Sequence, residues 1–131
     1  MHKETLSGIK LNPSAAAVKV RNFSFVFSFN AFTSNAVKLK GFTVNELSKI
    51  EDNYLDFVYV DAGHEYHDVK NDLEVSYKKV KNGGIIMGHD YNKDTFAGLC
   101  LAVDEFCEKY GLNIKYLTKD GCPTYLIELN K

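Results

Sequence analysis

The sequence predicts an α/β fold in which helices flank a parallel sheet and the last two strands are antiparallel. Two apolar runs, Leu55–Val60 and Ile85–Met87, each precede a stretch with helical periodicity, and continuous apolar runs are typical of buried parallel strands. Two further strand-like segments follow, separated by a turn. With 131 residues, of which 45% are hydrophobic, residues 1–131 are expected to form a single domain with its own core.

The first predicted helix follows the run Leu55–Val60. Its apolar side chains share one helical face, at Val69, Leu73, Tyr77 and Val80. Acidic residues near its start and lysines near its end suit the helix dipole. The pair Gly83–Gly84 is predicted to end it.

The second predicted helix follows the run Ile85–Met87. Its apolar face comprises Leu99, Val103, Phe106 and Tyr110. Asp94 or Thr95 is the expected N-cap, and Gly111 the expected stop. Strands are then predicted over Asn113–Leu117 and Thr124–Leu129.

The first third of the chain has a less regular pattern. Phenylalanines alternate with smaller residues over Phe23–Phe29, a period of two that indicates a strand. Val37–Phe42 is compatible with a short strand and Val44–Ile50 with a short helix. Residues 1–30 are therefore treated as an atypical N-terminal segment.

Composition disfavours several classes of partner. The 16 basic and 17 acidic residues are spread along the chain, which disfavours binding to nucleic acid or anionic lipid by bulk charge. The sequence contains no run of 18 apolar residues, so no membrane span is predicted. The three cysteines, Cys100, Cys107 and Cys122, include no C-x-x-C pair and are interpreted as reduced packing residues, so a cytoplasmic location is expected.

Polar residues follow both predicted parallel strands. Asp61 and His64 follow the first, within the stretch VDAGHEYHD, and His89 and Asp90 follow the second. Because ligands bind beyond the carboxyl ends of parallel strands, these four side chains are expected to meet in one crevice. The alternative is an ordinary solvated loop.

The chemistry of this cluster favours a hard cation and a base. His64 and His67 are three residues apart, which differs from the H-E-x-x-H spacing of zinc proteases. Two carboxylates beside an imidazole suit Mg²⁺, with His64 left to act as a base near neutral pH. His67 is expected to be exposed in the first turn of a helix.

Three stretches together carry a family resemblance: LDFVYVDAGHEYHDVKNDL, KVKNGGIIMGHDY and LAVDEF. They resemble the C-terminal half of class I S-adenosylmethionine-dependent methyltransferases, in the family with D-x-x-H-x-Y and GG-x4-HDY signatures. The resemblance covers residues 36–131 and implies a partial Rossmann-like sheet. It also implies S-adenosylmethionine as cofactor, a small-molecule substrate and methyl transfer to a hydroxyl group.

The resemblance also implies roles for individual residues. Asp61, His89 and Asp90 match positions that hold a divalent cation in related metal-dependent O-methyltransferases, and Asp61 borders the cofactor. His64 matches the position of a catalytic base. The residues expected to contact the adenine are Gly41, Phe42 and Thr43, with Asn45 or Glu46 nearby. Tyr91 is expected at the mouth of the substrate site.

The sequence departs from the family before Leu55. A glycine-rich loop is expected after the first strand of such enzymes, yet the only glycines there are Gly8 and Gly41. The expectation is a member truncated or rearranged at its N-terminal end, with Phe23–Phe29 covering a sheet edge or pairing with a second copy as a homo-oligomer. A non-catalytic binding module and a metal-dependent hydrolase are the alternatives to a methyltransferase.

Overall fold

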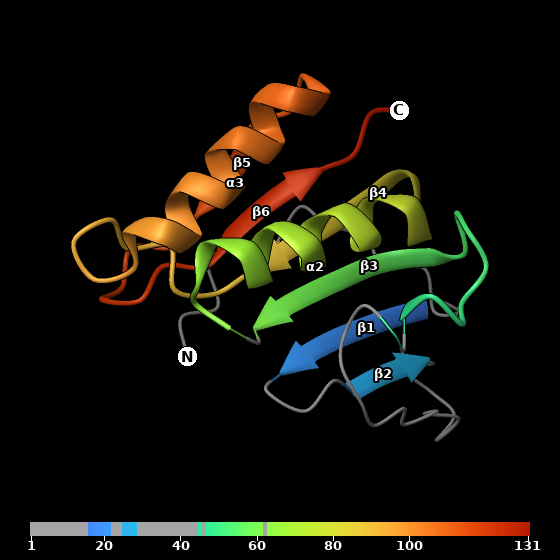
Figure 1. The fold of residues 1–131 in the computed structure, drawn as a ribbon. Coiled ribbons are helices and arrows are strands. Elements are labelled where there is room, and N and C mark those ends of the chain that lie inside the picture. Colours follow the sequence, from blue (N-terminus) through green and yellow to red (C-terminus); the bar gives the residue numbers. More distant parts are fainter. Residues whose placement is uncertain (1–15, 22–24, 29–44, 46, 62) are drawn as a thin grey trace.

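The computed structural model of the chain describes residues 16–21, 25–28, 45, 47–61 and 63–131. These residues form one six-stranded sheet in the order β2-β1-β3-β4-β6-β5 (Figure 1). In chain order, the elements are β1 (Ala16–Arg21), β2 (Phe25–Ser28), β3 (Leu55–Asp61), α2 (Tyr66–Lys79), β4 (Val80–Gly88), α3 (Ala97–Tyr110), β5 (Ile114–Leu117) and β6 (Tyr125–Glu128).

The centre of the sheet is parallel, as predicted. β3 pairs with β4 and, on its other side, with β1, and all three run in the same direction. Two segments flank this centre with antiparallel pairing. The predicted strand among the alternating phenylalanines is β2, which pairs with β1, and β6 joins β4 to the edge strand β5. The predicted antiparallel C-terminal pair is therefore confirmed.

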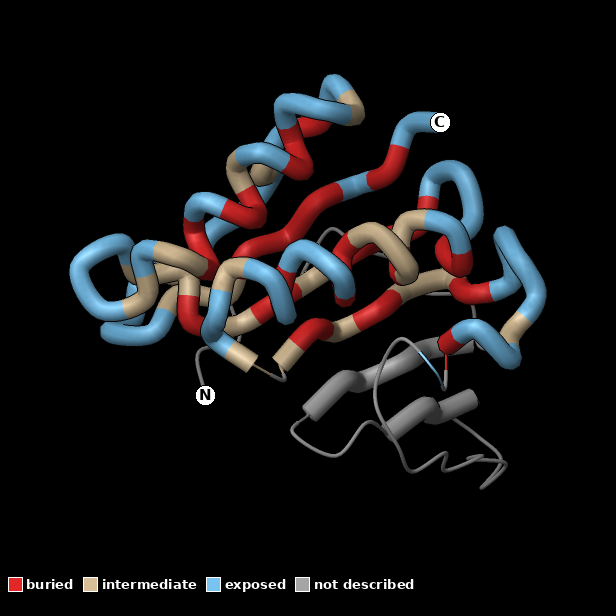
Figure 2. Tube along the Cα trace, viewed as in Figure 1, coloured by how far each residue is buried: buried red, intermediate tan, exposed pale blue. Residues whose placement is uncertain are grey.

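The helices α2 and α3 lie side by side on the same face of the sheet (Figure 1). Their buried sides face each other and the strands, as the colouring of Figure 2 shows. The core between these layers includes Val58, Leu73, Ile86, Val103 and Ile127, all fully or almost fully buried. Gly111 ends α3 in the left-handed conformation (φ 63°), as its sequence position predicted.

The prediction that Gly83–Gly84 ends the first helix is wrong. The helix α2 ends at Lys79, and β4 starts at Val80 without a loop, so both glycines lie within the strand. Val80 is completely buried in the sheet, although its spacing also fits the helical face. Gly84 is needed because a Cβ there would approach the carbonyl oxygen of Asp56 to 2.8 Å.

The start of α3 also differs from the prediction. Neither Asp94 nor Thr95 caps the helix, whose N-cap is Phe96 without a side-chain hydrogen bond. Instead the side-chain oxygen of Asn92 accepts hydrogen bonds from the backbone N–H groups of Asp94 and Thr95. This Asx-type turn satisfies donors ahead of the helix and shifts its start to Ala97.

Cysteine burial was predicted in part. Cys100 and Cys107 are free thiols buried in α3, but Cys122 is exposed, so the packing interpretation is wrong for that residue. The predicted strand Val37–Phe42 lies outside the described residues. Of the short helix predicted over Val44–Ile50, Asn45 and the fully buried Leu47 are helical. No helix among the described residues is long and apolar enough to cross a membrane.

Candidate active site at the carboxyl ends of β3 and β4

Two neighbouring parallel strands end side by side at the candidate site. In their register Val60 of β3 lies opposite Gly88 of β4. One residue further on, the N–H of His89 donates to the carbonyl oxygen of Val60 at 3.2 Å. The chain therefore leaves both strands at one edge of the sheet, as predicted for the crevice of an open α/β sheet.

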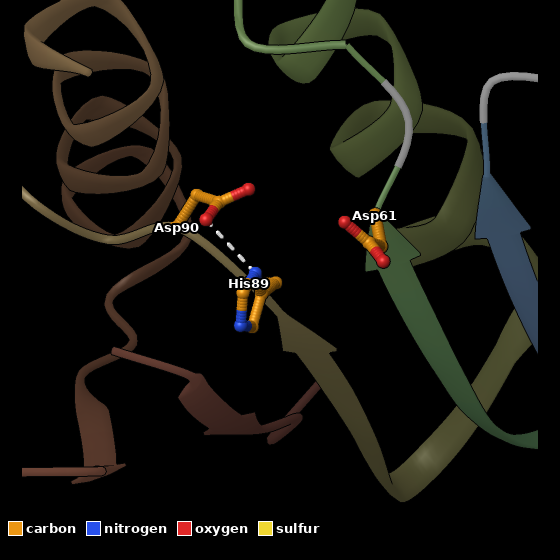
Figure 3. A group of neighbouring side chains, drawn as sticks. All are labelled: Asp61, His89 and Asp90. Atoms are coloured by element: carbon orange, nitrogen blue, oxygen red, sulfur yellow. Dashed lines mark ion pairs between the residues drawn. The ribbon is translucent and has the colours of Figure 1, made fainter. Parts of the chain in front are cut away.

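The structure brings Asp61, His89 and Asp90 together there. One ligand-type atom from each side chain lies within 4.8 Å of the others. Figure 3 shows Asp61 at the end of β3 and the other two residues just beyond β4. Asp90 is buried, whereas Asp61 and His89 are partly exposed, so a ligand could reach the cluster from solvent.

The carboxylate of Asp90 contacts two imidazoles. Nε2 of His64 lies 2.8 Å from Oδ2, and Nδ1 of His89 lies 2.9 Å from Oδ1 (Figure 3 marks the second contact). Partial burial raises the pKa of Asp90, but the hydrogen bonds and charges of His89 and His64 outweigh it and lower the pKa below its usual range. Asp90 is thus held as a carboxylate between two histidines.

The backbone at Asp90 has a left-handed conformation, with φ at 67°. A positive φ is uncommon for residues other than glycine, although aspartate tolerates it better than most. The following N–H groups hold the turn in place: Tyr91 donates to the carbonyl of Pro123 and Asn92 donates to that of Asp90. Conformations of this kind cluster at functional sites, where surrounding contacts maintain them.

The loop after β3 positions His64. Its ring stacks on Phe96, with the centroids 4.3 Å apart, and 43% of its side chain is exposed. Gly63 allows the loop to pass close to α2, since a Cβ there would lie 3.0 Å from a carboxylate oxygen of Asp68. Sequence reasoning missed Phe96, because its proximity to His64 depends on the packing of α3 against this loop.

Tyr91 does not turn its hydroxyl toward the cluster. The hydroxyl donates to Asp104 of α3 at 2.5 Å, and the ring meets Tyr125 edge-on. Burial and the carboxylate of Asp104 both raise the pKa of Tyr91. Its expected place at the substrate mouth therefore stays a prediction, and the hydroxyl contact with α3 is what the structure shows.

The remaining predicted residues fall in different places. His67 is exposed in the first turn of α2, as predicted. Asn45 is also exposed, while the expected adenine-contacting residues Gly41–Thr43 and Glu46 lie outside the described residues. Cys122, interpreted from the sequence as a packing residue, is exposed, and desolvation and the nearby carboxylate of Asp90 raise the pKa of its thiol.

A parallel sheet with acidic and imidazole groups beyond adjacent strands is typical of open α/β proteins, which as a class bind their ligands at the carboxyl ends of the strands. A family model described as a methyltransferase domain matches residues 2–91, and the chain belongs to this family. The match includes residues 2–35, where the sequence interpretation found no family motif.

Solved structures with the same fold include several methyltransferases. The O-methyltransferase NovP matches with a TM-score of 0.60 and 22% identity over 76% of this chain and 40% of its own. CalS11, a TDP-rhamnose 3'-O-methyltransferase, matches with a TM-score of 0.58 and 16% identity over 79% of this chain and 45% of its own. A SAM-dependent methyltransferase from Aquifex aeolicus matches with a TM-score of 0.54 and 17% identity, over 73% of this chain and 56% of its own. At these identities the likeness shows a shared fold.

One curated relative was found at the sequence level. It is an uncharacterised protein of Acanthamoeba polyphaga mimivirus, 36% identical over 67 residues. The match covers 48% of this chain and 30% of the relative. The chain thus spans under a third of this relative and about half or less of the matched structures.

Proposed function

We propose that the chain transfers a methyl group from S-adenosylmethionine to a hydroxyl of a small molecule such as a sugar or another polyol. Membership of the methyltransferase-domain family supports the reaction class. The O-methyltransferases among the matched structures suggest a hydroxyl acceptor. In this proposal S-adenosylmethionine supplies an electrophilic methyl group, and the chain supplies binding, orientation and proton transfer.

The observation that carries the proposal is the convergence of four predicted side chains at one sheet edge. Asp61 ends β3, His89 and Asp90 follow β4, and His64 reaches Asp90 from the adjoining loop. Such a cluster provides both a proton acceptor and anionic ligands beside an acceptor hydroxyl. An ordinary solvated loop would not require a buried carboxylate contacted by two imidazoles.

His64 is the proposed general base. A neutral imidazole has one donor nitrogen and one acceptor nitrogen. If Nε2 donates to Asp90, then Nδ1 is the nitrogen that can accept the proton of the substrate hydroxyl. Asp90 would fix this tautomer and stabilise the imidazolium that forms, as the carboxylate does in other His–Asp pairs.

The same cluster fits a divalent cation. Asp61, His89 and Asp90 would hold it, since their ligand-type atoms already lie within 4.8 Å of one another. A bound cation would lower the pKa of a coordinated hydroxyl. In this scheme Asp61 and Asp90 provide negative charge, His89 provides a nitrogen ligand, and His64 handles the proton.

A methyl-transfer assay tests the proposal. Labelled S-adenosylmethionine would be incubated with the protein, a divalent cation and a panel of sugars and polyols. We expect labelled product with wild type and a loss of about 100-fold or more with His64→Ala, the usual contribution of a general base. His67→Ala is the control, because His67 is exposed on α2 and should leave the rate unchanged.

A non-catalytic module that self-associates or binds a partner is the second candidate. Two observations favour it. The strand β1 is followed by the antiparallel strand β2 after residues 22–24, an order that differs from the strand–helix–strand succession of a dinucleotide-type fold. At the other edge, Tyr116 and Leu117 of β5 are 46% and 43% exposed. A dimer in light scattering that dissociates in Leu117→Lys, together with no methyl transfer, would favour this candidate.

A further inference from the structure

We infer that the site formed by Asp61, His89 and Asp90 selects a first-row transition-metal dication over Mg²⁺. This inference rests on the cation site of the proposed function. It goes beyond that proposal because it names the kind of cation, and it differs from the sequence analysis, which expected Mg²⁺. It depends on the chemistry of the ligand set and on the proximity of its three side chains. Neither depends on which substrate the protein methylates.

The ligand set is mixed. Mg²⁺ favours oxygen ligands and is commonly bound by one or two carboxylates with several waters. Imidazole nitrogen is instead a preferred ligand of iron, nickel, copper and zinc, and affinities of such sites rise across the first-row series. His89 stands directly between the strand end and Asp90, so an ion bound to both carboxylates would also meet its ring. The imidazole therefore favours a transition metal.

The nitrogen and oxygen donors are already adjacent. Nδ1 of His89 and Oδ1 of Asp90 are 2.9 Å apart, which is a hydrogen-bond distance. A cation that binds both atoms would replace the shared proton, because a ligating imidazole nitrogen must be unprotonated. The same two side chains can therefore offer one nitrogen and one oxygen ligand to a single ion.

His64 orients the shared carboxylate. Its Nε2 contacts Oδ2 of Asp90, which leaves Oδ1 on the side of His89. Partners of this kind fix ligating carboxylates, and their removal commonly costs about 10–100-fold in metal affinity. The left-handed backbone of Asp90, held by the N–H contacts of Tyr91 and Asn92, keeps the carboxylate in the same place before an ion binds.

Calorimetric titrations of metal-free protein with Co²⁺ alone and with Mg²⁺ alone test the inference. We expect Co²⁺ to bind at least about tenfold more tightly than Mg²⁺. The variant His89→Asp makes the ligand set all oxygen and should reduce or reverse this preference. His67→Asp introduces the same change at an exposed position of α2 and should preserve it. Circular dichroism checks that each variant is folded.

The visible spectrum of the Co²⁺ complex provides a second measurement. Visible bands that differ between wild type and His89→Asp would support an imidazole ligand to the ion, and identical spectra of the two complexes would contradict it. Equal affinities for Co²⁺ and Mg²⁺ in wild type, or a preference unchanged in His89→Asp, would overturn the inference. Failure of both ions to bind would overturn it together with the cation site.

The inference and the proposed function can fail separately. The titrations contain neither S-adenosylmethionine nor acceptor, so they measure the ion site alone. A clear Co²⁺ preference without methyl-donor binding would support the inference and count against the methyltransferase. Methyl transfer with equal affinity for the two ions would support the methyltransferase and overturn the inference.

Discussion

His64 and Asp90 are 26 residues apart in the chain, and a hydrogen bond of 2.8 Å between Nε2 and Oδ2 joins them. This contact links the loop after β3 to the turn after β4. In the proposed function His64 has two separable roles, as a proton acceptor toward substrate and as a group that orients Asp90. The first prediction separates these roles.

We expect His64→Gln and His64→Ala to differ in metal binding but to agree in catalysis. Glutamine can donate a hydrogen bond to Asp90 but cannot take up a proton, so both variants should lose about 10²–10⁴ in kcat. Only the alanine variant should also lose about 10–100-fold in Co²⁺ affinity. Steady-state kinetics measures the loss in kcat, and calorimetry measures the loss in Co²⁺ affinity. A glutamine variant with wild-type kcat would contradict the base role.

Gly88→Ala should destabilise the fold. A Cβ at Gly88 would lie 2.1 Å from the hydroxyl oxygen of Tyr125 and 2.2 Å from its ring, and that side chain is almost fully buried. Overpacking of this kind costs about 1–3 kcal/mol of unfolding free energy. The matched control is Gly121→Ala, where nothing lies within 4 Å and the change should stay within about 0.5 kcal/mol. Equal denaturation midpoints for the two variants would contradict the close approach.

Replacements of Asp90 should separate backbone strain from ligand loss. Both Asp90→Gly and Asp90→Ala remove the carboxylate, so both should lose metal binding in calorimetry. Only alanine keeps the cost of a left-handed Cβ, about 1–2 kcal/mol, so the glycine variant should be the more stable of the two in urea denaturation. A more stable alanine variant would show that Asp90 does not hold this backbone conformation in solution.

The contact between α2 and α3 should depend on pH through Glu74. Burial raises the pKa of Glu74, but hydrogen bonds from Lys109 and Tyr110 outweigh it and lower the pKa overall. The stabilisation is therefore present above the unfolded pKa of about 4.3 and is lost as pH falls through the lower folded pKa. It should amount to less than about 1 kcal/mol.

The comparison of wild type with Glu74→Gln measures this dependence. At pH 7 the variant should have the lower Tm, and the difference should shrink below about pH 4. Glu108→Gln, at an exposed position of α3, is the control and should show no such pH-dependent difference. A Tm difference that grows on acidification would contradict the assigned sign.

Local patterns predicted much of the parallel centre and the C-terminal strands. The apolar run Leu55–Val60 became most of β3, and the stripe over Leu99–Tyr110 became the buried side of α3. The helical pattern gave the wrong element for Val80. This residue is the first of β4 and follows α2 without a loop, so its position fits both the helical and the strand periodicity. A glycine in a sequence can likewise mark either the end of a helix or a close approach between strands. At Gly84 the reason is the close approach of the neighbouring strand β3.

The sequence predicted which residues of the candidate site lie at the ends of strands, but not the contacts between their side chains. The order of strands and helices placed Asp61 near His89 and Asp90. It could not show that Asp90 contacts two imidazoles, or that Phe96 stacks on His64, since both depend on how α3 packs over the loops. The pairing of β1 with β3 was also not predicted, because it joins segments more than 30 residues apart.

Binding of S-adenosylmethionine is the measurement that tests the central claim most directly. Calorimetric titration into wild-type protein with Co²⁺ present should show micromolar affinity. Asp61→Asn, at the end of β3, should weaken it, and His67→Ala on α2 should leave it unchanged. Absence of binding at millimolar S-adenosylmethionine by folded wild-type protein would contradict the claim that this chain is a methyltransferase.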